Sequence, residues 1–205
     1  MQCPHPHYGP KEGKVVDPDD VAFICLDLET TGLSPDTEWI LEVGITVADK
    51  ELHELASFES LVWPGDAGPL DNLDRVVRYM HQESGLLSEL LEGGKEVPTA
   101  DVVESRALDW LKSFGLPPGK FPLMGSTVHF DRAFLKVHMP DLESFFHYRN
   151  IDVSSIKEIS KVWHPNDGWV GSKEKRHRAL DDVSSTIEEA SFYYEKFFNG
   201  YSEGQ

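Results

Sequence analysis

The stretch Phe23–Leu33, with the sequence FICLDLETTGL, constrains the chain more than any other. Here an apolar run ends in two acids, Asp27 and Glu29, which are separated by one residue and followed by a turn-prone segment. In a strand, residues i and i+2 share a face, so both carboxylates would point the same way. Paired carboxylates repel each other and resist burial unless a cation lies between them, and hard divalent ions prefer such oxygen ligands. The pair therefore predicts either a metal site or a solvated strand end.

Length and composition indicate one globular domain. The chain has 205 residues, of which 40% are hydrophobic. No apolar run approaches the ~20 residues that span a bilayer, and the N-terminus does not have the pattern of a secretory signal. Two cysteines form no disulfide framework, and Cys25 is expected to be a reduced, buried thiol. We therefore expect a cytoplasmic protein without a membrane segment.

The charge balance limits the class of nucleic-acid partner. The formal net charge is −17, because 36 acidic residues outnumber 19 lysines and arginines. A long, non-specific nucleic-acid track needs many contacts between basic residues and phosphates, so this composition argues against one. A short nucleotide substrate, held by metal ions and a few basic groups, remains compatible with it.

The hydrophobic pattern predicts a single α/β domain at 21–198, with a flexible tail at 1–20 and another at 199–205. Cys3, His5 and His7 in the first tail are interpreted as incidental rather than as a zinc site. We expect a mixed five-stranded sheet, beginning with an antiparallel meander, whose strands cover 21–28, 39–48, 52–62, 121–124 and 151–153. We expect helices on its faces at about 70–80, 102–114, 130–140, 154–163 and 178–198, with Ser154 or Ser155 capping the fourth.

A metal site needs further acids from distant stretches of the chain. Asp131 follows the strand at 121–124 and would lie in the first turn of a helix, where α/β proteins often place functional groups. The same position suits an acid that only complements the helix dipole, so Asp131 alone does not indicate a metal.

His177 and Asp182 lie around the start of the last helix. Residues five apart do not share a helix face, so we place His177 in the preceding loop and Asp182 on the second turn, where both can lean into one cavity. Asp181 would point elsewhere and be either solvated or a partner that supports a metal ligand. A basic loop is usually just solvated, but beside acids it suits a negatively charged substrate and a proton transfer. The basic residues that flank His177 in this chain are Lys173, Lys175, Arg176 and Arg178.

With these residues the chain resembles the DEDD-type 3′→5′ exonucleases that carry a histidine, on the ribonuclease H-like fold, and more narrowly the oligoribonucleases. The motifs that carry the resemblance are Asp27–Leu33 (DLETTGL), Ile40–Gly44 (ILEVG), Met80–Leu86 (MHQESGL), Phe146–Ser154 (FHYRNIDVS) and His177–Asp182 (HRALDD). The motifs at Met80–Leu86 and Phe146–Ser154 are the ones that narrow the resemblance to oligoribonucleases.

The resemblance implies a two-metal hydrolase that acts on short RNA, down to dinucleotides. Two Mg²⁺ or Mn²⁺ ions would be held by Asp27, Glu29, Asp131 and Asp182. His177 would act as the general base that takes a proton from water, and the 3′-terminal nucleotide would leave as a 5′-monophosphate.

The resemblance also implies how the substrate is held. Leu33 would form a wedge against the bases, and Thr127, Arg149 and Ser154 would bind the 5′-phosphate. Family members are homodimers in which an aromatic tyrosine reaches the partner's site. That residue would be Tyr148, with an alternative role as a core or interface tyrosine. His81 and Lys157 are further candidates for contacts across the interface.

The chain departs from many relatives at two positions. Val76 replaces a tryptophan five residues before His81, where Tyr79 could supply the stacking, and Thr127 replaces a serine. These changes affect the expected substrate length rather than the chemistry. Two alternatives stay open from the sequence: a DNA 3′→5′ exonuclease of the same fold, and a non-catalytic nucleotide-binding module.

Overall fold

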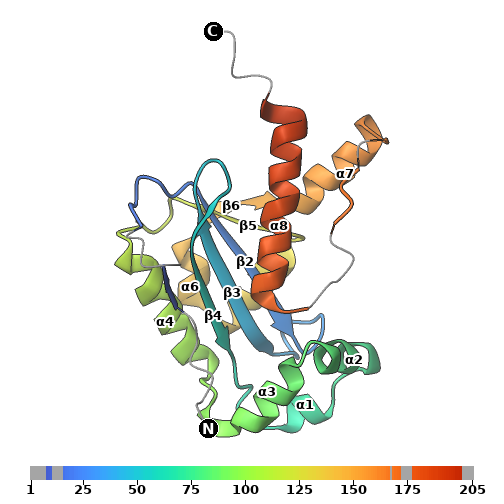
Figure 1. Ribbon diagram of the computed structural model, residues 1–205. Coiled ribbons are helices and arrows are strands. Elements are labelled where there is room, and N and C mark those ends of the chain that lie inside the picture. The colour runs from blue at the N-terminus through green and yellow to red at the C-terminus, as the bar shows by residue number, and fades with distance from the viewer. Residues whose placement is uncertain (1–7, 11–15, 167, 172–176, 200–205) are drawn as a thin grey trace.

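The computed structural model describes residues 8–10, 16–166, 168–171 and 177–199, which form a mixed sheet with helices on both faces (Figure 1). The sheet has six strands in the order β1-β4-β3-β2-β5-β6. Strands β2, β3 and β4 form an antiparallel meander, and β5 and β6 run parallel to β2. The strands are β1 (Tyr8–Pro10), β2 (Phe23–Thr30), β3 (Ile40–Ala48), β4 (Glu54–Leu61), β5 (Pro122–Gly125) and β6 (His147–Asp152).

The five predicted strands are all present, so the predicted fold class is confirmed. The sixth strand, β1, comes from the segment that we expected to be a tail, and it pairs antiparallel with β4. Val16, also in that segment, packs into the main hydrophobic core. Of the candidate tail ligands, Cys3, His5 and His7 lie outside the described residues.

The helices surround the sheet on both faces and at one end (Figure 1). No helix in the described parts of the chain is long and apolar enough to cross a membrane. The α-helices are α1 (Gly68–Asp71), α2 (Arg75–Glu83), α3 (Leu86–Gly93), α4 (Ala100–Ser113), α5 (His129–His138), α6 (Pro140–Phe145), α7 (Val153–Trp163) and α8 (Ala179–Tyr193). A 3₁₀ turn at Gly94–Glu96 and a π-helical turn at Tyr194–Phe198 complete the set.

Several elements differ from the predictions, and helix α3 was not among the expected helices. The expected helix at 70–80 is divided into α1 and α2. Helix α6 was not predicted: Pro140 stops α5, because a proline has no N–H for the helix, and then occupies the favoured first position of a new helix. Helix α7 is capped by Asp152 rather than by Ser154 or Ser155, since the Asp152 carboxylate accepts a hydrogen bond from the Ser154 N–H at 3.0 Å.

Strand β2 has two different faces. Ile24, Leu26 and Leu28 belong to the core that also contains residues of α4, α5 and α6. Cys25 points to the opposite face, where it packs in a cluster with Val183 of α8. Because side chains alternate along a strand, the residues that continue the Cys25 face lie under the start of α8. These are the two acids of the opening motif.

Helix α8 begins directly above Gly44 of β3, which is paired with Asp27 of β2. A Cβ atom at Gly44 would lie 2.6 Å from the carbonyl carbon of Ala179 and 2.8 Å from the nitrogen of Leu180. Only glycine therefore allows the first turn of α8 to approach the sheet this closely. The approach brings the beginning of α8 to the acidic end of β2.

Candidate active site

Five residues predicted from separate stretches of the chain line one cavity of about 330 Å³. Asp27 and Glu29 come from β2, Asp131 from the first turn of α5, and Asp182 from the first turn of α8. His177 lies in the segment just before α8, as the sequence predicted. Asp182 lies in the first turn of α8 rather than in the second, because the helix starts at Ala179, one residue later than expected. The structure therefore brings together the four acids and the histidine.

Asp131 is tied to the strand that carries the other acids. Its side chain is only 3% exposed, and its Oδ1 accepts a hydrogen bond from the backbone N–H of Leu28 at 3.1 Å. Leu28 lies between Asp27 and Glu29, so this bond fixes α5 relative to the pair. Asp131 is thus more than an acid complementing a helix dipole, and Asp181, by contrast, is exposed.

Burial raises the pKa values of three of these carboxyl groups, and neighbouring acids add to the effect for Asp27 and Glu29. Burial, together with the nearby charges of Asp182 and Glu42, raises the pKa of Glu29 to about 8. Burial raises the pKa of Asp131 to about 7. Burial and the charges of Asp131, Glu29 and Asp182 raise the pKa of Asp27 well above its ordinary value. The site therefore favours either protons or bound cations.

The donor set fits a hard divalent ion. Ligand atoms of Glu29, His177 and Asp182 lie within 4.8 Å of one another, so a single ion could contact all three. Carboxylate oxygens dominate the cavity, and such oxygens are the ligands that Mg²⁺ and Mn²⁺ prefer. The metal interpretation of the opening motif is favoured over the solvated strand end, because Glu29 is only 5% exposed.

A partly buried ion-pair network around Arg178, which the sequence did not predict, anchors His177. Arg178 Nη2 donates to Glu42 Oε1 at 2.6 Å, and Arg178 Nη1 donates to Glu89 Oε1 at 2.8 Å. Glu42, which is fully buried, also accepts from the backbone N–H of Ala179 at 2.9 Å. Glu42 thereby fixes the backbone on the C-terminal side of His177, which has a left-handed conformation with φ of 49°. The available signal was a glutamate inside the apolar strand motif ILEVG.

Two of the predicted phosphate-binding residues lie together, and the third lies on the adjoining strand. Thr127 lines the cavity, its N–H lies 3.0 Å from Asp152 Oδ1, and its hydroxyl lies 3.5 Å from the Ser154 hydroxyl. Arg149 is exposed on β6, the last strand of the sheet, with its guanidinium 5.4 Å from the centre of the Tyr148 ring.

Leu33, predicted to wedge against the bases, and Tyr148, predicted to reach the partner's site, are both large exposed side chains. Leu33 lines the same cavity as the acids and is 83% exposed. Tyr148 is 76% exposed, which contradicts a role in this chain's own core and leaves a role at an interface open. Val76 and Tyr79 are also exposed on α2.

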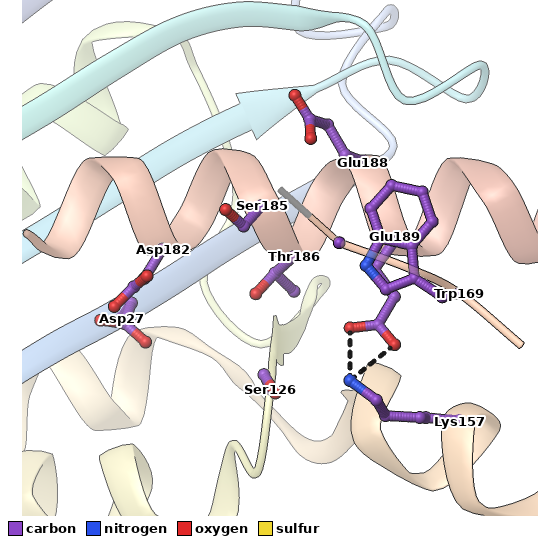
Figure 2. Close-up of a pocket in the computed structure, with 10 residues that line it drawn as sticks. Asp27, Ser126, Lys157, Trp169, Asp182, Ser185, Thr186, Glu188 and Glu189 are labelled. Atoms are coloured by element: carbon purple, nitrogen blue, oxygen red, sulfur yellow. Dashed lines mark hydrogen bonds and ion pairs between the residues drawn. The ribbon is translucent and has the colours of Figure 1, made fainter. Parts of the chain in front are cut away.

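A second cavity, of about 370 Å³, adjoins the first (Figure 2). The two cavities share Asp27, Ser126 and Asp182. In Figure 2, Asp27 and Asp182 lie at one end and Lys157 lies toward the other, where its Nζ is 3.1 Å from Glu189 Oε1. Lys157 is therefore engaged within its own chain, and a substrate contact would have to compete with Glu189.

The position of His81 is incompatible with its predicted contact across an interface. Its side chain is 0% exposed, so it offers no surface to a substrate or to a second subunit. Its Nε2 lies 2.9 Å from the carbonyl oxygen of Thr30. The motif around His81 pointed to the family, but the burial of the His81 side chain cannot be predicted from the motif. Three residues of the basic loop, Lys173, Lys175 and Arg176, lie outside the described residues.

Comparison with known proteins gives consistent results. The family model RNase_T, described as an exonuclease, matches residues 24–190. An oligoribonuclease of Neisseria meningitidis serogroup C is 38% identical over 172 residues, covering 84% of this chain and 90% of the relative. An oligoribonuclease of Nitrosomonas europaea is 38% identical over 181 residues, covering 88% of this chain and 98% of the relative.

Solved structures support the fold. An exonuclease I from Methylocaldum szegediense superimposes with a TM-score of 0.64 at 14% identity, covering 85% of this chain and 40% of that chain. Escherichia coli exonuclease I in complex with a dA16 oligonucleotide gives the same TM-score at 15% identity, covering 85% and 41%. The present chain thus spans less than half of these larger proteins, and the likeness concerns the fold alone.

Proposed function

Because this chain belongs to the RNase_T exonuclease family, we propose that it is a metal-dependent 3′→5′ exoribonuclease that degrades short RNA oligonucleotides, down to dinucleotides, to 5′-mononucleotides. The observation that carries the proposal is the convergence of Asp27, Glu29, Asp131, Asp182 and His177 on one cavity. The identity of about 38% to oligoribonucleases over most of the chain supports RNA as the substrate.

In the proposed mechanism the four acids would hold two divalent ions, Mg²⁺ or Mn²⁺. Such ions, when bound, stabilise the negative charge that develops on the scissile phosphate. His177 accepts the proton of the attacking water, as histidines commonly do in hydrolysis. The water oxygen attacks phosphorus, and the bond to the 3′-oxygen of the preceding nucleotide breaks. That oxygen takes up a proton to become a hydroxyl, and the terminal nucleotide leaves with a 5′-phosphate.

The substrate would extend from the carboxylates toward β6. Leu33, exposed at the cavity, would wedge against a base. The hydroxyl groups of Thr127 and Ser154 would donate hydrogen bonds to the 5′-phosphate. Arg149 would add a charge-assisted contact to the same phosphate. RNA preference would come from contacts to the 2′-hydroxyl.

We further propose a homodimer in which Tyr148 reaches the partner's site. A tyrosine that is 76% exposed supports this part of the proposal, because tyrosines are enriched at protein interfaces. Sedimentation equilibrium of the purified chain tests the assembly. A monomer at micromolar concentration with full activity would refute this part of the proposal.

The decisive assay compares three substrates in the presence of Mg²⁺. They are a 5′-phosphorylated diribonucleotide, a longer RNA and the DNA of matching sequence. Preferential turnover of the diribonucleotide, with 5′-mononucleotide products, is expected. Preferential cleavage of DNA would replace the proposal by a DNA exonuclease, and tight binding without turnover of any substrate would favour a binding module.

A further inference from the structure

His81 is the one predicted site residue whose position excludes its predicted role, and it makes two contacts beside the metal ligands. Its Nε2 lies 2.9 Å from the carbonyl oxygen of Thr30, the last residue of β2. Its Nδ1 lies 3.8 Å from Oε2 of Glu29, the residue before Thr30. The imidazole thus contacts both the side chain of Glu29 and the backbone that follows it.

The second nitrogen faces Glu29 and has no hydrogen bond among the described residues. Nδ1 of His81 is a buried polar atom that lacks a partner. Buried polar groups nearly always have one, and each exception requires an explanation. The 3.8 Å separation from Glu29 is an ion-pair distance, and a closure of about 1 Å would make it a hydrogen bond. Glu29 is therefore the natural partner of this nitrogen.

We infer that His81 is a positioning residue that orients Glu29 toward the metal site. Nε2 holds the end of β2 through the Thr30 carbonyl, and the ring lies against the Glu29 carboxylate. Groups behind a ligating carboxylate restrict its orientation, and their loss typically weakens metal binding about 10–100-fold. The inference rests on the proposed metal site, and His81 acts through Glu29 without touching the substrate.

The test measures metal affinity without any substrate. Mn²⁺ is titrated calorimetrically into the full-length chain and its variants at one pH. We expect His81→Ala to bind Mn²⁺ about 10–100-fold more weakly. In His81→Gln the amide nitrogen occupies about the position of Nε2 and keeps the Thr30 contact. In His81→Asn it occupies about the position of Nδ1 and keeps the Glu29 contact. Both should bind Mn²⁺ with intermediate affinity.

A second readout separates positioning from a general structural defect. With a diribonucleotide as substrate, the Mn²⁺ concentration for half-maximal activity should rise in His81→Ala in parallel with its weaker binding. At saturating Mn²⁺ the KM for the diribonucleotide should stay within about twofold, since His81 does not touch the substrate. A rise in KM at saturating metal would instead indicate a substrate contact and overturn the inference.

His138 provides a matched control. Its Nε2 also lies near a backbone carbonyl, that of Pro35 at 3.0 Å, and its ring stacks on Phe134. None of the groups that it contacts is a proposed metal ligand. His138→Ala should therefore keep the wild-type Mn²⁺ affinity, whatever it does to stability.

Three results would overturn the inference. One is a folded His81→Ala variant with wild-type Mn²⁺ affinity, and another is an equal loss of affinity in His138→Ala. If His81→Ala does not fold, the third is wild-type affinity in both His81→Gln and His81→Asn. Mn²⁺ binding that depends on His81, in a protein that hydrolyses no RNA, would refute the proposed function and leave this inference intact.

Discussion

Replacing Gly44 by alanine should damage the site without altering any residue that lines it. The added Cβ would lie 2.6 Å from the carbonyl carbon of Ala179, 2.8 Å from the nitrogen of Leu180 and 2.9 Å from the Cβ of Ala179. The first two neighbours are backbone atoms, so no rotamer change relieves the clash. Strand β3 lies between β2 and β4 in the sheet, whereas α8 lies on its surface, so we expect the helix to move.

The size of the movement follows from the contact distances. Ordinary carbon contacts begin at about 3.4 Å, so the start of α8 must retreat by about 0.8 Å. His177 and Asp182 move with it, and a displacement of about 1 Å can reduce turnover about 10²-fold. Overpacking of this kind costs about 2 kcal/mol, which corresponds to a melting temperature lower by roughly 4–8 °C for a domain of this size.

Gly168→Ala is the matched control, because a Cβ at Gly168 meets nothing within 4 Å. Both variants and the wild type would be compared by kcat/KM on a diribonucleotide, by Mn²⁺ titration and by thermal unfolding. We expect only Gly44→Ala to lose activity and metal affinity. If Gly44→Ala matched Gly168→Ala within about twofold in kcat/KM, the contact with Gly44 would not be what places α8 over the site.

Three further predictions concern charge. Asp27→Asn should abolish turnover and weaken Mn²⁺ binding yet raise the melting temperature of the metal-free protein, because it removes one charge from a buried like-charged cluster; a lower melting temperature would contradict this. The pKa values of about 8 for Glu29 and about 7 for Asp131 lie above those of the unfolded chain, so the unfolded state binds fewer protons between about pH 5 and 8. The free energy of unfolding of the metal-free protein should therefore fall as the pH rises through that range, and added Mn²⁺ should restore it. Denaturant unfolding followed by fluorescence measures both effects. Arg149→Ala should raise the KM for a 5′-phosphorylated diribonucleotide about tenfold and leave that for the 5′-hydroxyl form unchanged, whereas an equal effect on both would exclude a phosphate contact.

The sequence was informative where local pattern determines position. Alternation along β2 predicted that Asp27 and Glu29 share a face, and the strand confirms it with Cys25 on the same side. Helical spacing placed His177 before the last helix and Asp182 near its start. These predictions depend on neighbours in the chain, and the backbone geometry of strands and helices fixes them.

Contacts between distant segments could not be predicted in the same way. The ion pair of Glu42 with Arg178 joins residues 136 positions apart. The same difficulty applies to His81, whose contact with Thr30 depends on how α2 docks against the end of β2. Helix α6 escaped prediction because its six residues are too few to show a helical period.

The position of Arg178 explains why metal binding and stability should be linked in this protein. Its guanidinium lies against Glu42 and Glu89, neither of which is a proposed metal ligand. Its charge favours a lower pKa for Glu29, but burial and the nearby acids outweigh it, and the pKa of Glu29 is raised. An arginine directed at the ligands would stabilise the metal-free site and compete with the ions. Because Arg178 instead holds the start of α8, the repulsion among the ligands remains for divalent ions to relieve, and the ions should stabilise the fold over the same concentration range in which they activate hydrolysis.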